Sequence, residues 1–150
     1  MARYWLPPGF EPYRHRVHFT GWLSPDALAR WYREADVLVV PSRYEPFGMV
    51  VLERMLYGLP IAAADVGGPA KIPEHEHTGL LFPPRDAGAL ADTLIRLVKT
   101  PLLRQRLGQA AAREVRRMWL YSRVVERMRA VYEEVVVEAA PSIRVAPTQG

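Results

Sequence analysis

Short apolar runs alternate with segments of helical periodicity through the first two thirds of the chain. Residues 37–40, 60–64 and 80–82 form continuous apolar runs, which are typical of parallel strands that are covered on both faces. Residues 17–19 are predicted as a further short strand. Strands that alternate with helices predict an α/β domain with a parallel, right-handed wound sheet.

Helix signals follow or separate these runs. A helix is predicted after Ser24, where Pro25 and Asp26 follow a capping serine, and another over 48–57, which Gly58 would close as a C-terminal cap. From Asp86 onward the pattern is helical only. Further helices are predicted from 86, over 101–119 and from about 122. The apolar stripe along 124–136 is interpreted as core packing, with a partly exposed stripe as the alternative for a truncated domain.

Three segments organise the chain. Residues 1–16 contain three prolines and aromatic residues without a clear period, which predicts an irregular connector. Residues 17–139 are predicted to form one domain, which is of ordinary size for a single core. Residues 140–150 lack periodicity and are expected to be a disordered tail.

The composition is that of an ordinary globular protein, with 49% hydrophobic and 24% charged residues. The absence of cysteine excludes disulfides and thiolate chemistry, and no apolar run of membrane-spanning length occurs, so we expect a cytoplasmic protein. The net charge of +4 is compatible with an anionic partner, including peripheral contact with an acidic membrane. An arginine-rich composition bias accounts for the same charge, and we favour that interpretation.

Two carboxylates flank the turn at 46–48. Glu45 precedes it, and Glu53 follows eight residues later on a nearly apolar helix, where we expect a buried carboxylate. The residues three and four positions from Glu53 are uncharged: Met49, Val50, Leu56 and Tyr57. A ligand or a remote residue should therefore meet Glu53. For Glu53, a buried pair with an arginine such as Arg85 remains an alternative. For Glu45, the alternative is a solvated loop position beside Arg43 or Arg85.

The segment 41–48 leaves the carboxyl end of one predicted strand and enters a helix. In parallel α/β sheets, ligands lie beyond the carboxyl ends of the strands, and the N–H groups at a helix start attract anions. This segment is therefore the predicted ligand site.

Two other charged groups have simpler interpretations. His75, Glu76 and His77 lack a third credible metal ligand, so we interpret them as a solvated loop and expect no metal. The arginines at 113, 116 and 117 fit the solvent-facing side of a helix better than a phosphate or lipid site.

The sequence Glu-Pro-Phe-Gly at 45–48, followed by Leu-Glu-Arg-Met at 52–55, resembles the Glu-x7-Glu signature of retaining, nucleotide-sugar-dependent glycosyltransferases. The large family concerned, glycosyltransferase family 4 or group 1, has the GT-B fold. Further matching segments follow in the family's order and spacing: 17–21, 35–42, 58–60, 67–68, 78–81 and 84–86. The resemblance covers roughly residues 16 to 135.

This resemblance implies a Rossmann-like parallel sheet, the carboxy-terminal half of a GT-B enzyme, followed by an all-helical segment. It implies that Glu45 is the candidate catalytic residue, in a donor-positioning and not a covalent role, and that Glu53 binds the donor ribose. The predicted donor-binding set also includes Ser42, Pro46, Phe47, Gly48 and Met49. The implied substrates are a nucleotide diphosphate sugar, such as a UDP-sugar, and an unknown acceptor, with no metal or other cofactor.

The sequence departs from the family in two respects. The Gly-Arg and Lys-Gly segment that holds the donor diphosphate in the family has no counterpart before residue 17, so we expect a domain truncated at its start. Lys71 stands where relatives usually carry Glu. These departures leave open whether the chain alone is an enzyme, a non-catalytic remnant, or one part of a split enzyme completed by a second polypeptide. A nucleic-acid-binding module is disfavoured, since no platform of interleaved aromatic and basic residues occurs.

Overall fold

The structure is a computed structural model that describes residues 9–68 and 70–139. The predicted tail and the first half of the predicted connector lie outside these residues. The chain divides into two units, Met1–Trp31 and Tyr32–Gly150. The first contains the 3-10 helix η1 (Glu11–Arg16), where an irregular segment was predicted, and the start of helix α1 (Pro25–Glu34).

The predicted strand at 17–19 is wrong. These residues are not in a strand, and the Val17 and Phe19 side chains are 40% and 46% exposed. β-branched and aromatic residues favour a strand only where neighbouring strands and a packed face support it.

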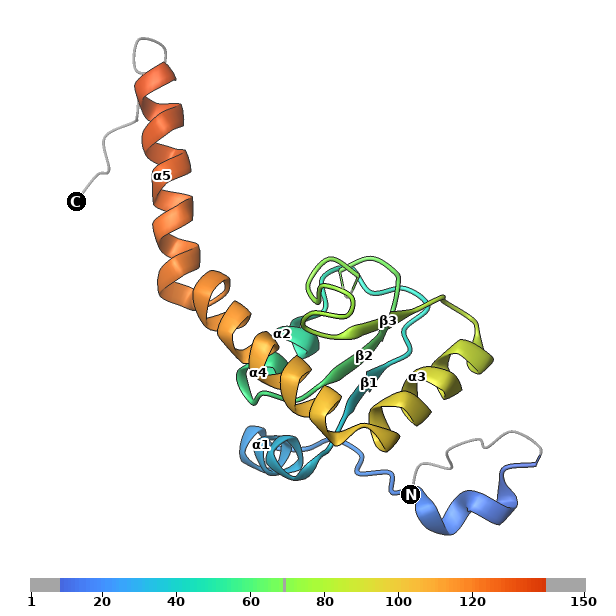
Figure 1. The fold of residues 1–150 in the computed structure, drawn as a ribbon. Helices are drawn as coiled ribbons and strands as arrows, with labels where there is room; N and C mark the ends of the chain where they lie inside the picture. Colours follow the sequence, from blue (N-terminus) through green and yellow to red (C-terminus); the bar gives the residue numbers. More distant parts are fainter. Residues whose placement is uncertain (1–8, 69, 140–150) are drawn as a thin grey trace. The chain divides into compact units, whose positions relative to one another are not determined.

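The second unit contains the remaining strands and helices, shown in Figure 1. In chain order they are β1 (Leu38–Val40), α2 (Met49–Leu56), β2 (Ile61–Ala64), β3 (Leu80–Phe82), α3 (Ala87–Lys99), α4 (Pro101–Met118) and α5 (Tyr121–Ala139). Wherever the sequence predicted the first or last residue of one of these elements, the observed residue lies within one or two positions of it. The predicted caps are also present: Asp86 Oδ1 accepts a hydrogen bond from Ala89 N over 2.9 Å, and Gly58 follows α2 with φ of 70°.

The strands form a parallel sheet in the order β1-β2-β3. Val39 pairs with Ala62, and Ala63 pairs with Leu81, so β2 is hydrogen-bonded on both sides. The predicted α/β class with a parallel sheet is confirmed, and so is the helical carboxy-terminal segment.

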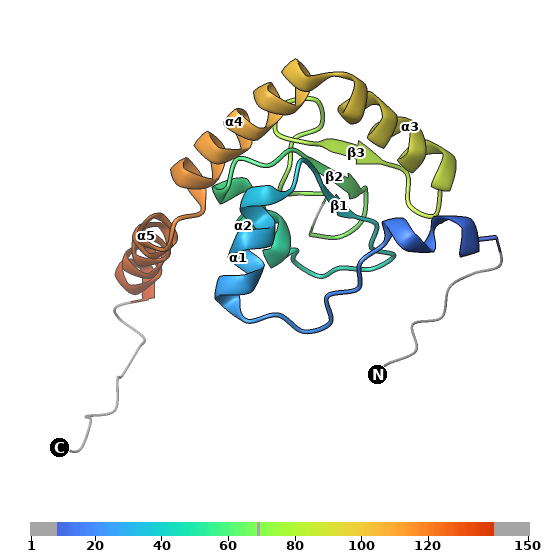
Figure 2. The same cartoon turned by 90° about the horizontal axis from the view of Figure 1, so that it is seen from below.

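The side chains of β2 alternate between two core layers. Ile61 and Ala63 pack with residues of α2, whereas Ala62 and Ala64 pack with residues of α3. Accordingly, α2 and α3 lie on opposite faces of the sheet (Figure 2). Helix α4 contributes to both layers, because Leu107 belongs to the layer of α3 and Val115 to that of α2. Small side chains on β2 permit this close packing.

Helix α5 differs from the others in that its apolar stripe is exposed. Val125, Met128, Val131 and Tyr132 are between 41% and 63% exposed. The interpretation of this stripe as core packing is therefore wrong. Over residues 9–68 and 70–139, no helix has the length and apolar character needed to cross a membrane.

Candidate functional site at the carboxyl edge of the sheet

Three loops meet at the carboxyl edge of the sheet, as expected for parallel strands. The segment 41–48 follows β1, residues 65–68 follow β2, and residues 83–86 follow β3. Two main-chain hydrogen bonds join neighbouring loops or strand ends: Gly68 N donates to Glu45 O over 2.9 Å, and Asp65 N donates to Phe82 O over 2.9 Å. The predicted site residues at 42–49 therefore lie on a loop that is fixed by its neighbour.

The start of α2 is shaped by Gly48 and Glu45. Gly48 is buried and has φ of 86°, a left-handed conformation that favours glycine. Its N–H donates to Glu45 Oε1 over 3.1 Å, and its carbonyl accepts from Val51 N over 2.8 Å as the first helical bond. The Glu45 carboxylate thus lies at the positive end of the helix dipole, and the N–H groups of Met49 and Val50 in the first turn have no acceptor within the helix.

The Gly67–Gly68 turn supports this loop from the neighbouring strand. A Cβ atom placed on Gly68 would overlap the main chain of Phe47, and one on Gly67 would overlap the carbonyl of Glu45. The two main chains are therefore in a contact that only glycine permits. The sequence alone identifies the Gly-Gly pair as a turn, but its contact with the 45–47 loop is tertiary.

The other predicted donor-binding residues lie at or near the surface of the same loop. Phe47 and Met49 are 47% and 58% exposed, Pro46 is exposed, and Ser42 is half-buried. The Phe47 ring meets the ring of Trp119 edge-on, with centroids 6.0 Å apart, at the end of α4. Trp119 was not among the predicted site residues, because nothing in its local pattern indicates a contact with residue 47.

Glu53 is exposed, so the predicted burial of its carboxylate is wrong. The buried face of α2 is defined by Val51, Leu52 and Met55. At 3.6 residues per turn, Glu53 lies roughly opposite the centre of that face. Its expected remote partner proves to be Tyr32, whose hydroxyl donates to Glu53 Oε2 over 3.3 Å. The alternative pairing with Arg85 does not occur among the described residues.

The buried charge of α2 is instead Arg54, which is 7% exposed. Its guanidinium lies against the ring face of Tyr32, and among the described residues no hydrogen-bond acceptor meets its Nε. Burial lowers the pKa of Arg54 to about 10, while Tyr57 partly opposes this shift, so the side chain remains protonated at neutral pH. Sequence patterns did not indicate this residue, since long charged side chains are usually exposed.

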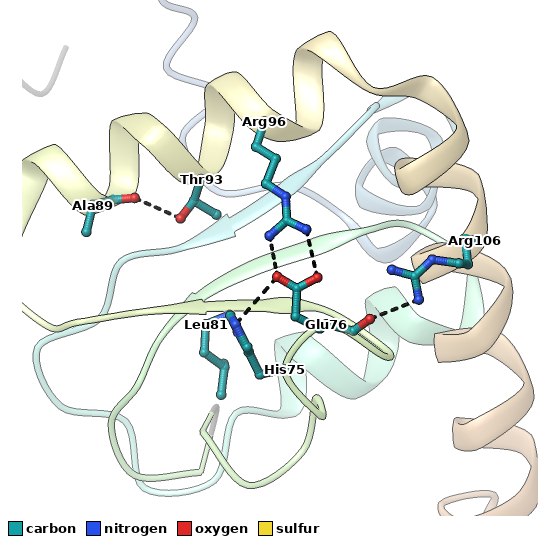
Figure 3. A network of polar contacts seen from close by, with 7 residues as sticks. All are labelled: His75, Glu76, Leu81, Ala89, Thr93, Arg96 and Arg106. Carbon is teal, nitrogen blue, oxygen red and sulfur yellow. Dashed lines mark hydrogen bonds and ion pairs between the residues drawn. The ribbon is translucent and has the colours of Figure 1, made fainter.

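The loop at 75–77 is held by ion pairs and by main-chain bonds, as Figure 3 shows. Arg96 of α3 forms a bidentate pair with the Glu76 carboxylate, and Arg106 of α4 donates to the Glu76 carbonyl over 2.9 Å. The hydrogen bond from Arg96 lowers the pKa of Glu76. His75 Nδ1 accepts from Leu81 N over 2.9 Å. The loop is thus more ordered than a merely solvated one.

No group of three or more possible metal ligands occurs among the described residues. The apolar groove around Met128 and Tyr132 lies on α5, which carries none of the predicted site residues. The carboxyl edge of the sheet is therefore the candidate functional site.

The same region matches known proteins. The family model described as "Glycosyl transferases group 1" matches residues 11–114. An uncharacterized glycosyltransferase of Methanocaldococcus jannaschii is 33% identical over 120 residues, which are 80% of this chain and 31% of that protein. The structure of sucrose-phosphate synthase from Thermosynechococcus elongatus superposes with a TM-score of 0.77 and 36% identity, over 86% of this chain and 33% of that one.

A third neighbour, HepE of Anabaena in complex with UDP-glucose, has a TM-score of 0.72 and 22% identity, over 81% of this chain and 33% of that one. At this identity the likeness concerns the fold. The chain spans about a third of the length of these proteins. The match over residues 11–114 and the identity to the archaeal relative establish that this chain belongs to the group 1 glycosyl transferase family.

Proposed function

We propose that this chain is the donor-binding part of a retaining glycosyltransferase of glycosyltransferase family 4, which uses a nucleotide diphosphate sugar. The observation that carries the proposal is the position of Glu45 and of the start of α2 on one fixed loop at the carboxyl edge of the sheet. Because the chain spans about a third of its relatives, we assign donor binding to it, and the complete transfer reaction to a longer assembly.

The donor diphosphate would bind at the start of α2. The first turn of a helix offers main-chain N–H groups and the positive end of the dipole, a combination that suits phosphate oxygens. Glu45 already accepts the N–H of Gly48, so the diphosphate would meet the N–H groups that follow. Because Gly48 has no Cβ, the ligand can approach the main chain closely there.

The sugar and the nucleoside would extend in opposite directions from this point. Glu45 would accept hydrogen bonds from hydroxyls of the transferred sugar, while Phe47 and Met49, both partly exposed, would line its path. Glu53 lies on the exposed side of α2, about one turn after its first residue, where its carboxylate is accessible to a ribose. From Met49 to Glu53 the helix rises about 6 Å, and the non-helical segment 45–48 adds to the separation of the two carboxylates, as the two ends of a nucleotide sugar require.

The solved complex of HepE with UDP-glucose supports a uridine donor, since its fold resembles that of this chain. We assign Glu45 a donor-positioning role, because its contact with Gly48 N holds the carboxylate at the helix start. We expect no metal to be required, since the helix start and the basic side chains of a complete site would balance the diphosphate charge. We assign acceptor binding, like the complete reaction, to the longer assembly.

Calorimetric titration with UDP, GDP and ADP, and with their glucose conjugates, tests the proposal. We expect one of the nucleotides to bind. Glu53→Gln should lower the affinity for it by about one to two orders of magnitude, because hydrogen bonds to a charged group each contribute about 1.5–3 kcal/mol. Glu74→Gln, on an exposed loop acid, is the matched control. Glu45→Gln should weaken the sugar conjugate and leave the free nucleotide unchanged.

Two results would contradict the proposal. Absence of binding by all six compounds would indicate a non-catalytic role within the family. Binding that survives Glu53→Gln at full strength would remove the ribose assignment, while leaving the diphosphate site to be tested through the start of α2.

A further inference from the structure

We propose that Tyr32 is a positioning residue for Glu53: its buried phenol holds the carboxylate in place for the hydroxyls of a donor ribose. This inference rests on the ribose-binding role proposed above. Tyr32 lies 21 residues before Glu53 and on a different helix, and its hydroxyl is 3.3 Å from Glu53 Oε2.

Glu53 needs such a partner because it is exposed. A glutamate side chain on a helix surface samples several rotamers, and a ligand that selects one of them loses part of its binding free energy to that ordering. The hydroxyl of Tyr32 favours the rotamers in which Oε2 points toward that hydroxyl. The carboxylate therefore arrives partly ordered at the encounter with its ligand.

Tyr32 is itself held firmly. Its side chain is 4% exposed, and Tyr57 meets its ring edge-on with centroids 5.5 Å apart and an interplanar angle of 73°. The guanidinium of Arg54 covers a face of the same ring. A tyrosine has two side-chain torsions, so this packing fixes the direction in which the hydroxyl points. The donor to Glu53 is thus a rigid part of the core and not a surface side chain.

The stoichiometry of hydrogen bonds is compatible with a ribose. An ionised carboxylate offers about four acceptor positions on its two oxygens. Tyr32 occupies one position on Oε2, which leaves Oε1 and the second lone pair of Oε2 for two vicinal hydroxyls.

Tyr32→Phe in the complete chain tests the inference, because it removes the hydroxyl and keeps the ring that packs against Arg54. The probe is the diphosphate among UDP, GDP and ADP that binds most tightly, together with its 2′,3′-dideoxy analogue. At 3.3 Å the hydrogen bond is long, so its effect should be moderate. We expect Tyr32→Phe to lower the affinity for the ribonucleotide about three- to tenfold and that for the dideoxy analogue by less than twofold. Tyr57→Phe, which keeps the neighbouring ring, should change neither affinity.

A double-mutant cycle separates positioning from a general structural effect. In the Glu53→Gln background, Tyr32→Phe should have little further effect on ribonucleotide affinity, since the carboxylate through which it acts has been removed. Equal weakening of both nucleotides, or an undiminished effect in the Glu53→Gln background, would overturn the inference. An unchanged affinity for the ribonucleotide would overturn it as well.

Failure of the proposed function gives a different result. In that case the wild-type chain would not distinguish the ribonucleotide from the dideoxy analogue, or would bind neither, before any change at Tyr32. Thermal unfolding of each variant shows whether the core around residue 32 is retained, and Tyr32→Phe should shift the melting temperature little because the ring remains buried.

Discussion

The main-chain N–H of Gly48 donates to Oε1 of Glu45 over 3.1 Å, so a carboxylate three residues earlier satisfies the N–H of the residue that precedes α2. This arrangement gives Glu45 a structural effect apart from any ligand. Its carboxylate fixes Gly48 and places a negative charge at the helix start, and both effects stabilise the helix by small but measurable amounts. A substitution at Glu45 must therefore be tested for folding before it is interpreted as a binding effect.

We expect Glu45→Ala to lower the free energy of unfolding by about 1 kcal/mol, because the Gly48 N–H loses its acceptor. Glu45→Gln retains an oxygen acceptor and should lose about half of that or less, mainly from the removed charge. Urea unfolding at neutral pH measures both. An equal loss in the two variants would show that the charge, and not the acceptor, is what matters.

We expect Gly68→Ala to lower the free energy of unfolding by about 1–3 kcal/mol, the range for an overpacked position. The added Cβ meets the main chain of Phe47, which cannot move aside as a flexible side chain could. Gly88→Ala in the first turn of α3 is the control, since its Cβ lies 3.3 Å from Asp86 Oδ1 and alanine favours a helix. Thermal unfolding compares them, and comparable losses would rule out the close approach of the two loops.

We expect Arg54→Met to raise the free energy of unfolding by about 1 kcal/mol or more. Replacement of a buried, incompletely bonded charge by an apolar side chain of similar length is often neutral or stabilising. Because burial lowers the pKa of Arg54 to about 10, the unfolded chain binds this proton more tightly. The gain should therefore shrink as the pH rises through 10.

Urea unfolding at pH 7 and pH 10.5 measures the difference between the wild type and Arg54→Met. A methionine variant that is less stable at pH 7 would show that the stacking of the guanidinium on Tyr32 outweighs its desolvation. Arg30 is an exposed arginine of α1, and Arg30→Met is the matched control. Its free energy of unfolding should differ little from that of the wild type at both pH values.

We expect the contribution of Glu76 to depend on pH in the direction of a carboxylate with a lowered pKa. The hydrogen bond from Arg96 favours the charged form, so its stabilisation is present above the ordinary pKa of about 4.5 and is lost as the pH falls through the lowered value. The pair is partly exposed, so we expect Glu76→Gln to cost about 1 kcal/mol or less at pH 7.

The measurement is the difference in urea midpoint between the wild type and Glu76→Gln at pH 7 and at pH 2.5. The difference should be clear at pH 7 and smaller at pH 2.5, because protonation of Glu76 removes the charge that Arg96 binds. Arg96→Met should reproduce the loss at pH 7. A difference of undiminished size at pH 2.5 would show that the main-chain conformation of residue 76, where φ is 65°, accounts for it instead.

Strand and helix positions in the second unit were predictable because local signals agreed with the fold. The continuous apolar runs became buried strands, and Asp86 and Gly58 ended or began helices where their chemistry indicated. Where local preference lacked tertiary support, as at 17–19, the prediction was wrong. A strand needs a neighbour, and the sequence of one segment does not say whether a neighbour is present.

The site was predictable as a place but not in its contacts. The loop at 42–49 lies at the carboxyl edge, where the order of strand and helix requires it to lie. The burial of Glu53 was wrong because Met49 and Leu56, counted as its apolar surroundings, are themselves 58% and 40% exposed. Which side of α2 is buried depends on packing with the sheet and α4. The same holds for α5. Its periodicity shows that the apolar side chains lie on one face of the helix, but not whether another element packs against that face.

The tie between Gly68 N and Glu45 O has a consequence for how this loop can diversify. The hydrogen bond joins main-chain atoms, so it does not depend on the side chains of Arg43 and Tyr44, which precede Glu45 in the loop. Arg43 is exposed and Tyr44 is 81% exposed, and both can change while the main chain keeps its course. A combinatorial library at these two positions, on an invariant Gly67–Gly68 turn, would vary the chemistry of the rim while the scaffold stays constant.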